Sequence, residues 1–339
     1  MKFSIYLTII ALAFSACTGN GKKGPDVSGI KVNTTIARFD KDYFAIDSGK
    51  LNDGLKQLRQ QYPWFINDFT AHILGAGVIS DSNQVLPIAN QRFYSSYYSV
   101  YQSVKKDFEN LADTEKELNK GFSTLKYYFP AYEVPRFVSY FGPFDAPGAA
   151  LTENAIAIGL QLYAGKDFPV YTTTQGQEIF PAYISRRFEK PYIASNCIKA
   201  VMEDMFPDKS QGLPLVEQMV EKGKYWWLLD QLLPETADSI KTGFTGEQLK
   251  WCAGNEGVTW NQMLQNDQLY SMEPGIIQMY IGDAPGTQGF PPAAPGNIGQ
   301  WIGLRIVQSY ISKNPDTTPE QLMKLSARTI LDGAKYKPR

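Results

Sequence analysis

The chain contains one histidine, His72, and this scarcity restricts the chemistry that it can perform. A serine or cysteine nucleophile usually needs a histidine base, and catalytic zinc usually takes at least one histidine ligand. The sequence contains neither a G-x-S-x-G nucleophile motif nor an H-E-x-x-H metal-binding motif. His72 lies between apolar residues in DFTAHILGAGVI, away from any acidic cluster, so we expect a structural histidine with satisfied hydrogen bonds.

Paired carboxylates are a catalytic machinery that the composition still allows. A glycosidase needs only two carboxyl groups at the right separation, which a sequence cannot show. The candidates lie near predicted loops and strand ends and are Asp145, Glu153, Glu178 and Glu256. Most acidic residues are simply solvated, so we expect a protein without catalytic residues, bound metal or cofactor. A cell-wall or glycan hydrolase that uses paired carboxylates remains the alternative.

Cys17 ends a segment that is typical of a lipoprotein export signal. Lys2 is followed by an uncharged apolar stretch, residues 3–16, which is too short to span a bilayer but has the length of a signal-peptide core. The small residues before Cys17 resemble a bacterial lipobox, although Phe14 stands where leucine is usual. We therefore predict a signal peptide over residues 1–16 and lipid attachment at Cys17. An ordinary secretory signal with an incidental cysteine is the alternative.

Residues 17–29 predict a lipidated cysteine followed by a flexible tether. The sequence TGNGKKGPDVSG is rich in glycine and polar residues and has no apolar period. Twelve such residues have a root-mean-square reach of about 20 Å. We expect the folded body to sit close to a membrane without being embedded in it.

The other two cysteines, Cys197 and Cys252, lie on segments that predict amphipathic helices. An oxidising periplasm would allow them to form a disulfide. A small buried thiol is the commoner outcome on such helices, so we expect two free cysteines. The sequence leaves the pairing open.

The first half of the chain supplies the predicted strands. Alternating apolar residues indicate strands over 30–38, 135–142 and 154–163. The third strand carries small residues on one face, so we expect something to pack very close to it. Apolar residues at helical spacing indicate helices over 48–60 and 91–110. Thr114 and Glu117 form a possible capping box for the next helix.

The second half of the chain is predicted to be helical. The apolar period indicates helices over 181–188, 191–205 and 213–233. Further helices begin at two capping signals, Thr245 with Gln248 and Thr318 with Gln321, and the first of them continues to Trp260. We predict an α+β fold that is predominantly helical, with a small sheet from the N-terminal half, in a single globular domain over residues 30–339.

A glycine- and proline-rich segment interrupts the helical half at residues 282–299. Loops of this length inside a compact domain are uncommon and are often functional. The helix that follows, QWIGLRIVQSYI, is apolar on most faces. We expect the loop to contribute to a site and the helix to be central in the fold.

Charge and composition restrict the partners. The chain has 33 basic and 34 acidic residues and a net charge of −1, which gives no field to attract nucleic acid. It contains 20 tyrosines, and Tyr94, Tyr97, Tyr98 and Tyr101 share helical spacing. Tyrosine-rich surfaces often mark grooves or partner faces, but a large core with half-buried tyrosines would have the same composition. Both interpretations remain open.

The chain resembles the GldB-type gliding-motility lipoproteins of the Bacteroidetes over nearly all of its mature length. The resemblance is carried, in order, by IARFDKD, VPRFVSYFGPFD, AIAIGLQLYAGKDFPVY, YISRRFEKPYIASNCIKAVMEDMFP, EKGKYWWLLDQLLPETADSIKTGFTGEQLKWC, PGNIGQWIGLRIVQSYISKNP and AKYKPR. It implies a cell-envelope lipoprotein that works with the gliding or secretion machinery and has no established catalytic activity. The tether lacks the acidic cluster that resembles surface-export signals in these bacteria, so we expect the outer membrane, facing the periplasm.

A more distant resemblance concerns zincin-type metallopeptidases. The order of strand, helix, second helix, glycine-rich loop and helix is similar to their layout. The metal-binding motif would align near Asn196 and Lys199, and Lys222 stands where the third ligand would precede Gly223. Lysine donates protons and is no metal ligand at neutral pH. The resemblance implies a zincin-like fold with a degenerate metal site, and a non-catalytic binding or assembly component of the envelope.

Overall fold

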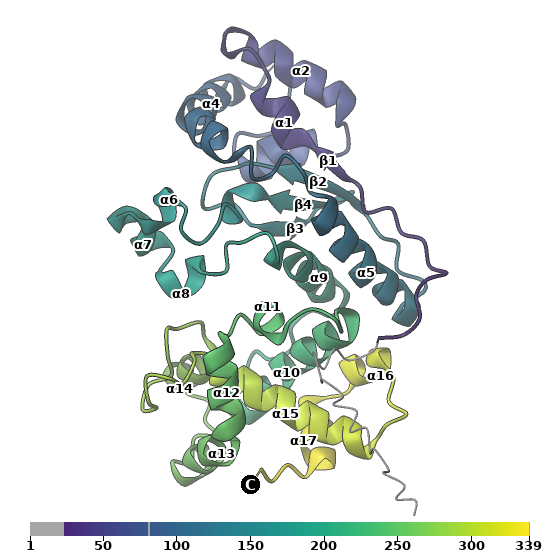
Figure 1. Ribbon diagram of the computed structural model, residues 1–339, viewed down its shortest axis with the longest axis vertical. Coiled ribbons are helices and arrows are strands. Elements are labelled where there is room, and N and C mark those ends of the chain that lie inside the picture. Colours follow the sequence, from purple (N-terminus) through teal and green to yellow (C-terminus); the bar gives the residue numbers. More distant parts are fainter. Residues whose placement is uncertain (1–23, 81, 339) are drawn as a thin grey trace, which may run out of the picture.

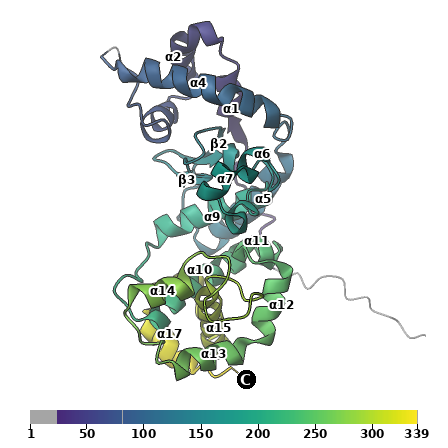
Figure 2. The same cartoon turned by 90° about the vertical axis from the view of Figure 1, so that its left-hand side faces the viewer.

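The computed structural model describes residues 24–80 and 82–338. The expected signal peptide, Cys17 and the first part of the expected tether lie outside this range. The molecule is elongated, with the N-terminal half (residues 24–205) at one end of the long axis and the C-terminal half (residues 215–338) at the other, and the two views agree on this arrangement (Figures 1 and 2).

A four-stranded mixed sheet lies inside the N-terminal half. Its strands are β1 (Ile36–Arg38), β2 (Arg136–Tyr140), β3 (Ala149–Leu151) and β4 (Ala155–Gly159), in the order β1-β2-β4-β3. The first three strands in this order are parallel, whereas β3 runs antiparallel to β4 at the edge of the sheet. Every residue of β4 is buried, as expected for a strand covered on both faces.

The predicted strands are present but shorter than expected. Only Ile36–Arg38 of the first segment pairs in the sheet. The residues before it instead accept or donate hydrogen bonds along helix α5 (Ala112–Tyr128), for example from Ser123 Oγ to the Ile30 carbonyl at 3.2 Å. The last strand ends at Gly159, where a side chain would meet the Pro147 carbonyl at 2.3 Å. This close approach confirms that something packs tightly against the small face of β4.

The helices of the N-terminal half surround the sheet. Besides α5 they are α1 (Phe39–Phe44), α2 (Leu51–Gln61), α3 (Ile66–Asp68) and α4 (Val85–Val104), with a 3-10 turn at Ser48–Lys50 and a π-helical turn at Phe69–Ile73. Phe39 of α1 contacts the rings of Tyr43, Phe65 and Phe69 at centroid distances of 4.7 to 5.9 Å. The capping box predicted at Thr114 is wrong, because α5 already begins at Ala112 and Thr114 is buried in its first turn.

Short helices and one long helix lead from the sheet to the C-terminal half. They are α6 (Pro169–Thr172), α7 (Thr174–Ile179), α8 (Ala182–Ser185) and α9 (Tyr192–Met205), preceded by a 3-10 turn at Leu160–Leu162. Helix α9 packs against α5 and β3 on one side and against the next long helix, α10 (Leu215–Leu232), on the other. Together with α5, which also packs against α10, it joins the two halves (Figure 1).

The C-terminal half is built around two central helices, α10 and α15 (Ile298–Lys313). The others are α11 (Asp238–Thr242), α12 (Gly246–Gly254), α13 (Glu256–Gln265), α14 (Pro274–Ile281), α16 (Pro319–Lys324) and α17 (Ala327–Ala334). The capping box predicted at Thr245 and the N-cap predicted at Thr318 are both confirmed, and Thr318 also forms a capping box with Gln321. The helix expected to run to Trp260 is divided at Asn255 into α12 and α13.

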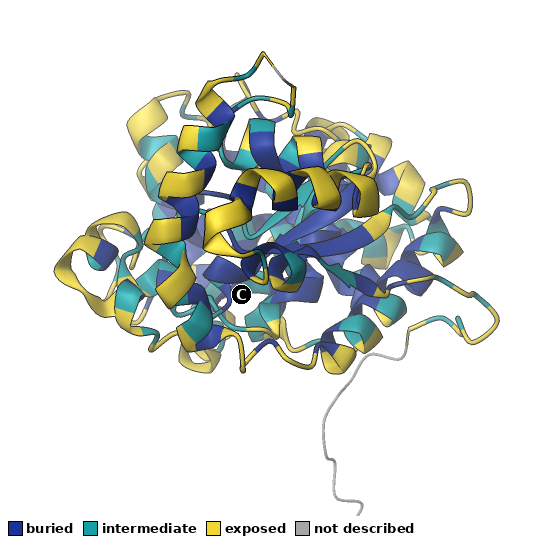
Figure 3. Cartoon of the chain, turned by 90° about the horizontal axis from the view of Figure 1, so that it is seen from above, coloured by how far each residue is buried: buried dark blue, intermediate teal, exposed yellow. Residues whose placement is uncertain are grey.

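The fold class is the predicted one, α+β and predominantly helical, with its small sheet in the N-terminal half. Buried residues lie on the inward faces of the helices and exposed residues on their outer faces (Figure 3). Helix α15 is central, as its apolar sequence predicted. Over residues 24–80 and 82–338, no helix is both long enough and apolar enough to cross a membrane.

Candidate functional site

Two neighbouring cavities lie where α9 faces the C-terminal half, and together we call them the central cleft. The larger, of about 620 Å³, is bounded by α9, α10 and the segment that follows α14. The smaller, of about 300 Å³, extends from α9 to β3 and the end of β4. Arg187, Lys199 and Glu203 line both cavities, so the two cavities adjoin at these side chains.

The sheet edge at this cleft has unused hydrogen-bonding groups. The bonds from Thr152 N to the Ala155 carbonyl and from Gly159 N to the Gly148 carbonyl fix the register of β3 on β4. Because antiparallel pairs alternate, the N–H and C=O groups of Ala149 and Leu151 point away from β4. Within the described chain no strand lies beyond β3, and Ala149 lines the smaller cavity. An exposed edge of this kind is a template for another strand.

Lys199, on α9, is the cation that both cavities share. Burial, reinforced by the positive charge of Arg187, lowers the pKa of Lys199 to about 8, although Asp283 and Glu203 act in the opposite direction. Among the described residues no carboxylate lies within ion-pair distance of its amine. Lys199 is therefore a cation of reduced basicity that has no salt-bridge partner of its own.

Two ion pairs hold four of the other charges of the cleft, Lys222 with Asp208 and Arg187 with Asp283, whereas Glu203 of α9 is in neither pair. Lys222 of α10 lies 2.6 Å from Asp208, which also accepts hydrogen bonds from the Ser210 amide and hydroxyl at 2.9 Å. Burial alone would raise the pKa of Asp208, but the hydrogen bonds from Lys222 and Ser210 outweigh burial and lower it. This carboxylate is therefore fixed in place as an anion.

The long loop predicted to contribute to a site does so through Asp283. Arg187 lies 3.3 Å from Asp283, and Asn297 Nδ2 donates to the same carboxylate at 3.1 Å. Asn297 has a left-handed backbone conformation, with φ of 45°, which turns the chain from the loop into α15. The loop thus closes one wall of the larger cavity.

The three positions proposed from the zincin resemblance all lie on the central cleft. Lys199 lines both cavities, Asn196 lines the smaller and Lys222 the larger. Asn196 Nδ2 donates to the Tyr163 hydroxyl at 3.0 Å, so it holds the wall of the cleft. Over residues 24–80 and 82–338, no three His, Cys, Asp or Glu side chains are grouped so that they could hold a metal ion. Sequence reasoning missed Arg187, Asp208 and Asp283, whose partners are distant in the chain.

The structure does not gather the four carboxylates considered for hydrolysis. Asp145, Glu153 and Glu178 are exposed and line neither cavity of the central cleft. Glu256, on α13, lies 3.1 Å from Arg305 and accepts a hydrogen bond from the Tyr336 hydroxyl at 2.6 Å. It therefore ties α13 to α15 and to the end of the chain.

The histidine and the two described cysteines do not line the central cleft. The expectation of a satisfied structural His72 is wrong, because it is exposed on the π-helical turn after α3. The turn buries Phe69 and Thr70 and leaves His72 exposed. The expectation of free, buried thiols is confirmed for Cys197 and Cys252. Burial raises the pKa of both, that of Cys252 to about 12, so neither is a ready nucleophile.

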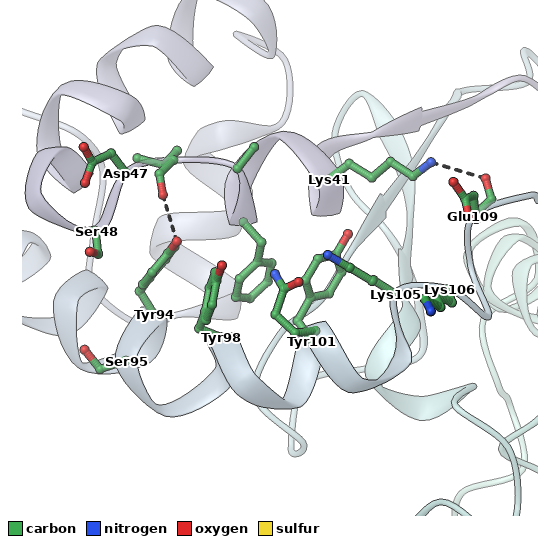
Figure 4. A pocket seen from close by; sticks show the side chains of 14 residues that line it. Lys41, Asp47, Ser48, Tyr94, Ser95, Tyr98, Tyr101, Lys105, Lys106 and Glu109 are labelled. Atoms are coloured by element: carbon green, nitrogen blue, oxygen red, sulfur yellow. Dashed lines mark hydrogen bonds between the residues drawn. The ribbon is translucent and has the colours of Figure 1, made fainter.

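A second hollow, the tyrosine groove, lies at the far end of the N-terminal half, between α4 and the segment of α1 and its following loop (Figure 4). Its volume is about 1000 Å³, and its walls include Lys41, Ser48, Tyr98, Gln102, Lys105 and Lys106. Tyr94 and Tyr101 are buried beneath it, whereas Tyr98 is 41% exposed. The tyrosine-rich segment thus serves both the core and a groove.

The fold and the cleft define a helix-rich α+β protein whose central cleft carries fixed charges. The chain belongs to the gliding motility protein GldB family, whose model matches residues 20–338. This confirms the resemblance seen in the sequence and makes the protein an envelope lipoprotein connected with gliding motility. No curated protein and no solved structure matches the chain significantly.

Proposed function

We propose that this protein is a non-catalytic binding component of the gliding machinery, whose central cleft holds an extended segment of another envelope protein. The observation that carries the proposal is the free edge of β3, which opens into the cleft. A segment laid along β3 would exchange backbone hydrogen bonds with Ala149 and Leu151, while its side chains would enter the two cavities. Main-chain bonds would supply affinity, and the cavities would select the sequence.

The charges of the cleft indicate the kind of segment that fits. Asp208 and Asp283 already face Lys222 and Arg187, whereas Lys199 has no ion-pair partner in the described part of the chain. Lys199 is half-buried, and a partly desolvated cation without a counter-charge is unfavourable, so an incoming carboxylate would stabilise it. We therefore expect an acidic side chain on the segment, opposite Lys199.

The donor groups of the cleft support a role without metal chemistry. A zincin-type enzyme would present metal ligands where this chain has Asn196, Lys199 and Lys222. Protonated lysines repel a cation instead of ligating it. Metal analysis of the purified protein tests this point, because one tightly held zinc per chain would contradict a degenerate, pseudoenzyme-like site.

The proposed location follows from the anchor. Lipid on Cys17 would hold the protein to the outer membrane with its folded part in the periplasm, beside the other envelope components of the machinery. The family match supports an envelope lipoprotein, and the absence of an acidic cluster after Cys17 supports the periplasmic side.

The sharpest test removes a backbone N–H of β3 that points away from β4. Ala149→Pro removes a donor that β4 does not use, and proline is tolerated on edge strands. Cells that carry this variant should lose gliding, while the amount, membrane attachment and melting temperature of the protein stay unchanged. Ala149→Ser keeps the N–H and is the matched control, which should glide normally.

A second variant tests the same proposal without introducing a proline into the strand. Lys199→Glu reverses the charge of the half-buried cation that, among the described residues lining the cleft, has no ion pair, and it should also abolish gliding. Normal gliding of both Ala149→Pro and Lys199→Glu would overturn the proposal. So would turnover of cell-wall fragments by the purified protein that is lost in Glu153→Gln or Glu178→Gln, because that result would establish the hydrolase alternative.

A further inference from the structure

We propose that the tyrosine groove is a binding site for a saccharide chain that carries carboxylate groups. The groove is separate from the central cleft, because none of its lining residues lines either cavity of the cleft. Its volume of about 1000 Å³ and open shape suit an oligomer that enters from the side. The inference does not depend on what occupies the central cleft.

An exposed aromatic platform supports the choice of a saccharide. The Tyr98 ring stacks on Tyr94 with centroids 5.2 Å apart and an interplanar angle of 29°. Tyr94 is itself fixed, because its hydroxyl donates to the Ile46 carbonyl at 2.8 Å (Figure 4). The negative face of a tyrosine ring attracts the slightly positive C–H groups on the flat face of a sugar. Tyr98 therefore offers a rigid surface on which a sugar ring can stack.

The polar rim of the groove matches the remaining groups of a sugar. Ser48 and Ser95 bring hydroxyls from opposite walls (Figure 4), and Gln102 adds an amide to the lining. Each of these side chains both donates and accepts, as a ring of alternating hydroxyl groups requires. A peptide would instead need apolar pockets for side chains, whereas Phe44 and Tyr101 at the base of the groove are buried and stacked on each other at 4.3 Å.

Three lysines give one end of the groove its charge and explain why the saccharide should be acidic. Lys41, Lys105 and Lys106 line that end, and all three are exposed. Glu109 is the acidic residue that lines the same end, and its backbone carbonyl accepts a hydrogen bond from Lys41 Nζ at 3.2 Å. The local excess of positive charge favours a ligand with carboxylates.

The test uses the full-length protein and two glycans with the same backbone. Peptidoglycan glycan strands that have been freed of their peptides carry a lactyl carboxylate on alternate sugars, whereas chitin oligosaccharides lack it. We expect the protein to bind the first and to bind the second at least about tenfold more weakly, since charged hydrogen bonds contribute on this scale. Binding is measured by calorimetry or by fluorescence of a labelled glycan.

Two groove variants separate stacking from charge. Tyr98→Ala should weaken binding of both glycans by roughly tenfold, because it removes the platform. Lys105→Gln with Lys106→Gln should weaken only the carboxylate-bearing glycan. The matched controls are Tyr270→Ala, at a tyrosine that is 63% exposed elsewhere, and Lys56→Gln with Lys116→Gln, at exposed lysines outside the groove. Both controls should bind as the wild type does.

Three outcomes would overturn the inference. The first is absence of binding to the carboxylate-bearing glycan, and the second is binding that the groove variants leave unchanged. The third is equally tight binding of poly-glutamate, which would identify the groove as a site for acidic peptides. Because Tyr98 and the two lysines are exposed, the variants should keep the wild-type melting temperature, which is recorded alongside.

Discussion

At the residue scale, Asp40 is a fully buried carboxylate that connects four elements, its own helix α1 included. Arg38 of β1 lies 2.7 Å from it, Ser139 of β2 donates to it at 2.6 Å and Tyr101 of α4 donates at 3.0 Å. Burial alone would lower the pKa of Arg38, but the hydrogen bond and charge of Asp40 outweigh burial and raise it. This network fixes α4, and with it the tyrosine groove, to the sheet.

Replacing Asp40 should therefore lower the free energy of unfolding by more than a substitution at an exposed residue does. Asp40→Asn leaves Arg38 partly buried without its counter-charge, and we expect a loss of about 3 to 5 kcal/mol in the free energy of unfolding. Denaturant unfolding measures it. Asp53→Asn, at an exposed position of α2, is the control and should change stability by less than about 0.5 kcal/mol. A loss below about 1 kcal/mol for Asp40→Asn would show that the network does not hold the fold.

The lowered pKa of Lys199 predicts a measurable titration. Competitive amine labelling across pH should give a midpoint near pH 8 for Lys199 and a midpoint near the ordinary lysine value of about 10.5 for the exposed Lys56. The unfolded chain holds this proton more tightly than the folded one, so the stability of the fold should rise as pH increases above about 8. Arg187→Gln removes a neighbouring charge and should raise the midpoint, and a wild-type midpoint near 10 would contradict the described cleft.

At the scale of elements, the contact between α10 and α15 decides the shape of the C-terminal half. The two helices cross so closely that a Cβ on Gly303 would lie 1.7 Å from the Met219 carbonyl oxygen. A Cβ on Gly223 would lie 2.2 Å from the backbone of Gly303. Lys222 precedes Gly223, so the same crossing sets where its amine meets Asp208 in the central cleft.

Gly303→Ala should force these helices apart. The added methyl meets helix backbone, which cannot move aside as a flexible side chain would, and overpacking of this kind costs about 1 to 3 kcal/mol or more. The change is followed by thermal unfolding. Gly275→Ala, on a helix where nothing lies within 4 Å of the new Cβ, is the control and should be neutral or slightly stabilising. Equal stability of the two variants would refute the close crossing.

The sequence predicted the elements better than the site, for physical reasons that particular residues show. Local signals were sufficient for the capping boxes at Thr245 and Thr318 and for the buried strand β4. The pairing of Lys222 with Asp208 and of Arg187 with Asp283 depends on how distant segments pack, and no local pattern shows it. The family resemblance, not the residue types alone, pointed to Asn196, Lys199 and Lys222.

At the scale of the whole molecule, the start of the described chain predicts which part would face a membrane to which the proposed lipid on Cys17 is attached. A side chain at Gly24 would meet Pro234, and Ser123 donates to the Ile30 carbonyl, so the two ends of segment 24–30 lie against the fold. Seven Cα steps separate Cys17 from Gly24, a span of at most roughly 25 Å. Lipid on Cys17 would therefore keep the Pro234 region near the membrane, while α2 and α4 lie toward the other end of the long axis (Figure 1).

Removing the anchor should release the protein without unfolding it. In Cys17→Ser the lipid cannot attach, so we expect the chain to move from the membrane fraction to the soluble fraction and gliding to fail. The melting temperature of the purified protein should not change, because Cys17 precedes the packed segment. A variant that stays membrane-bound and supports gliding would contradict the anchor.

The central claim is that the cleft beside β3 holds a segment of one envelope partner, and crosslinking in gliding cells tests it most directly. A photo-crosslinking amino acid would replace Ala200, which lines the smaller cavity, and, as a control, Ile88, which is 72% exposed on α4. The account predicts a covalent adduct from position 200 to one extended segment of a single envelope protein, its loss in Ala149→Pro and its absence from position 88. No adduct at position 200, or the same adducts from both positions, would contradict it.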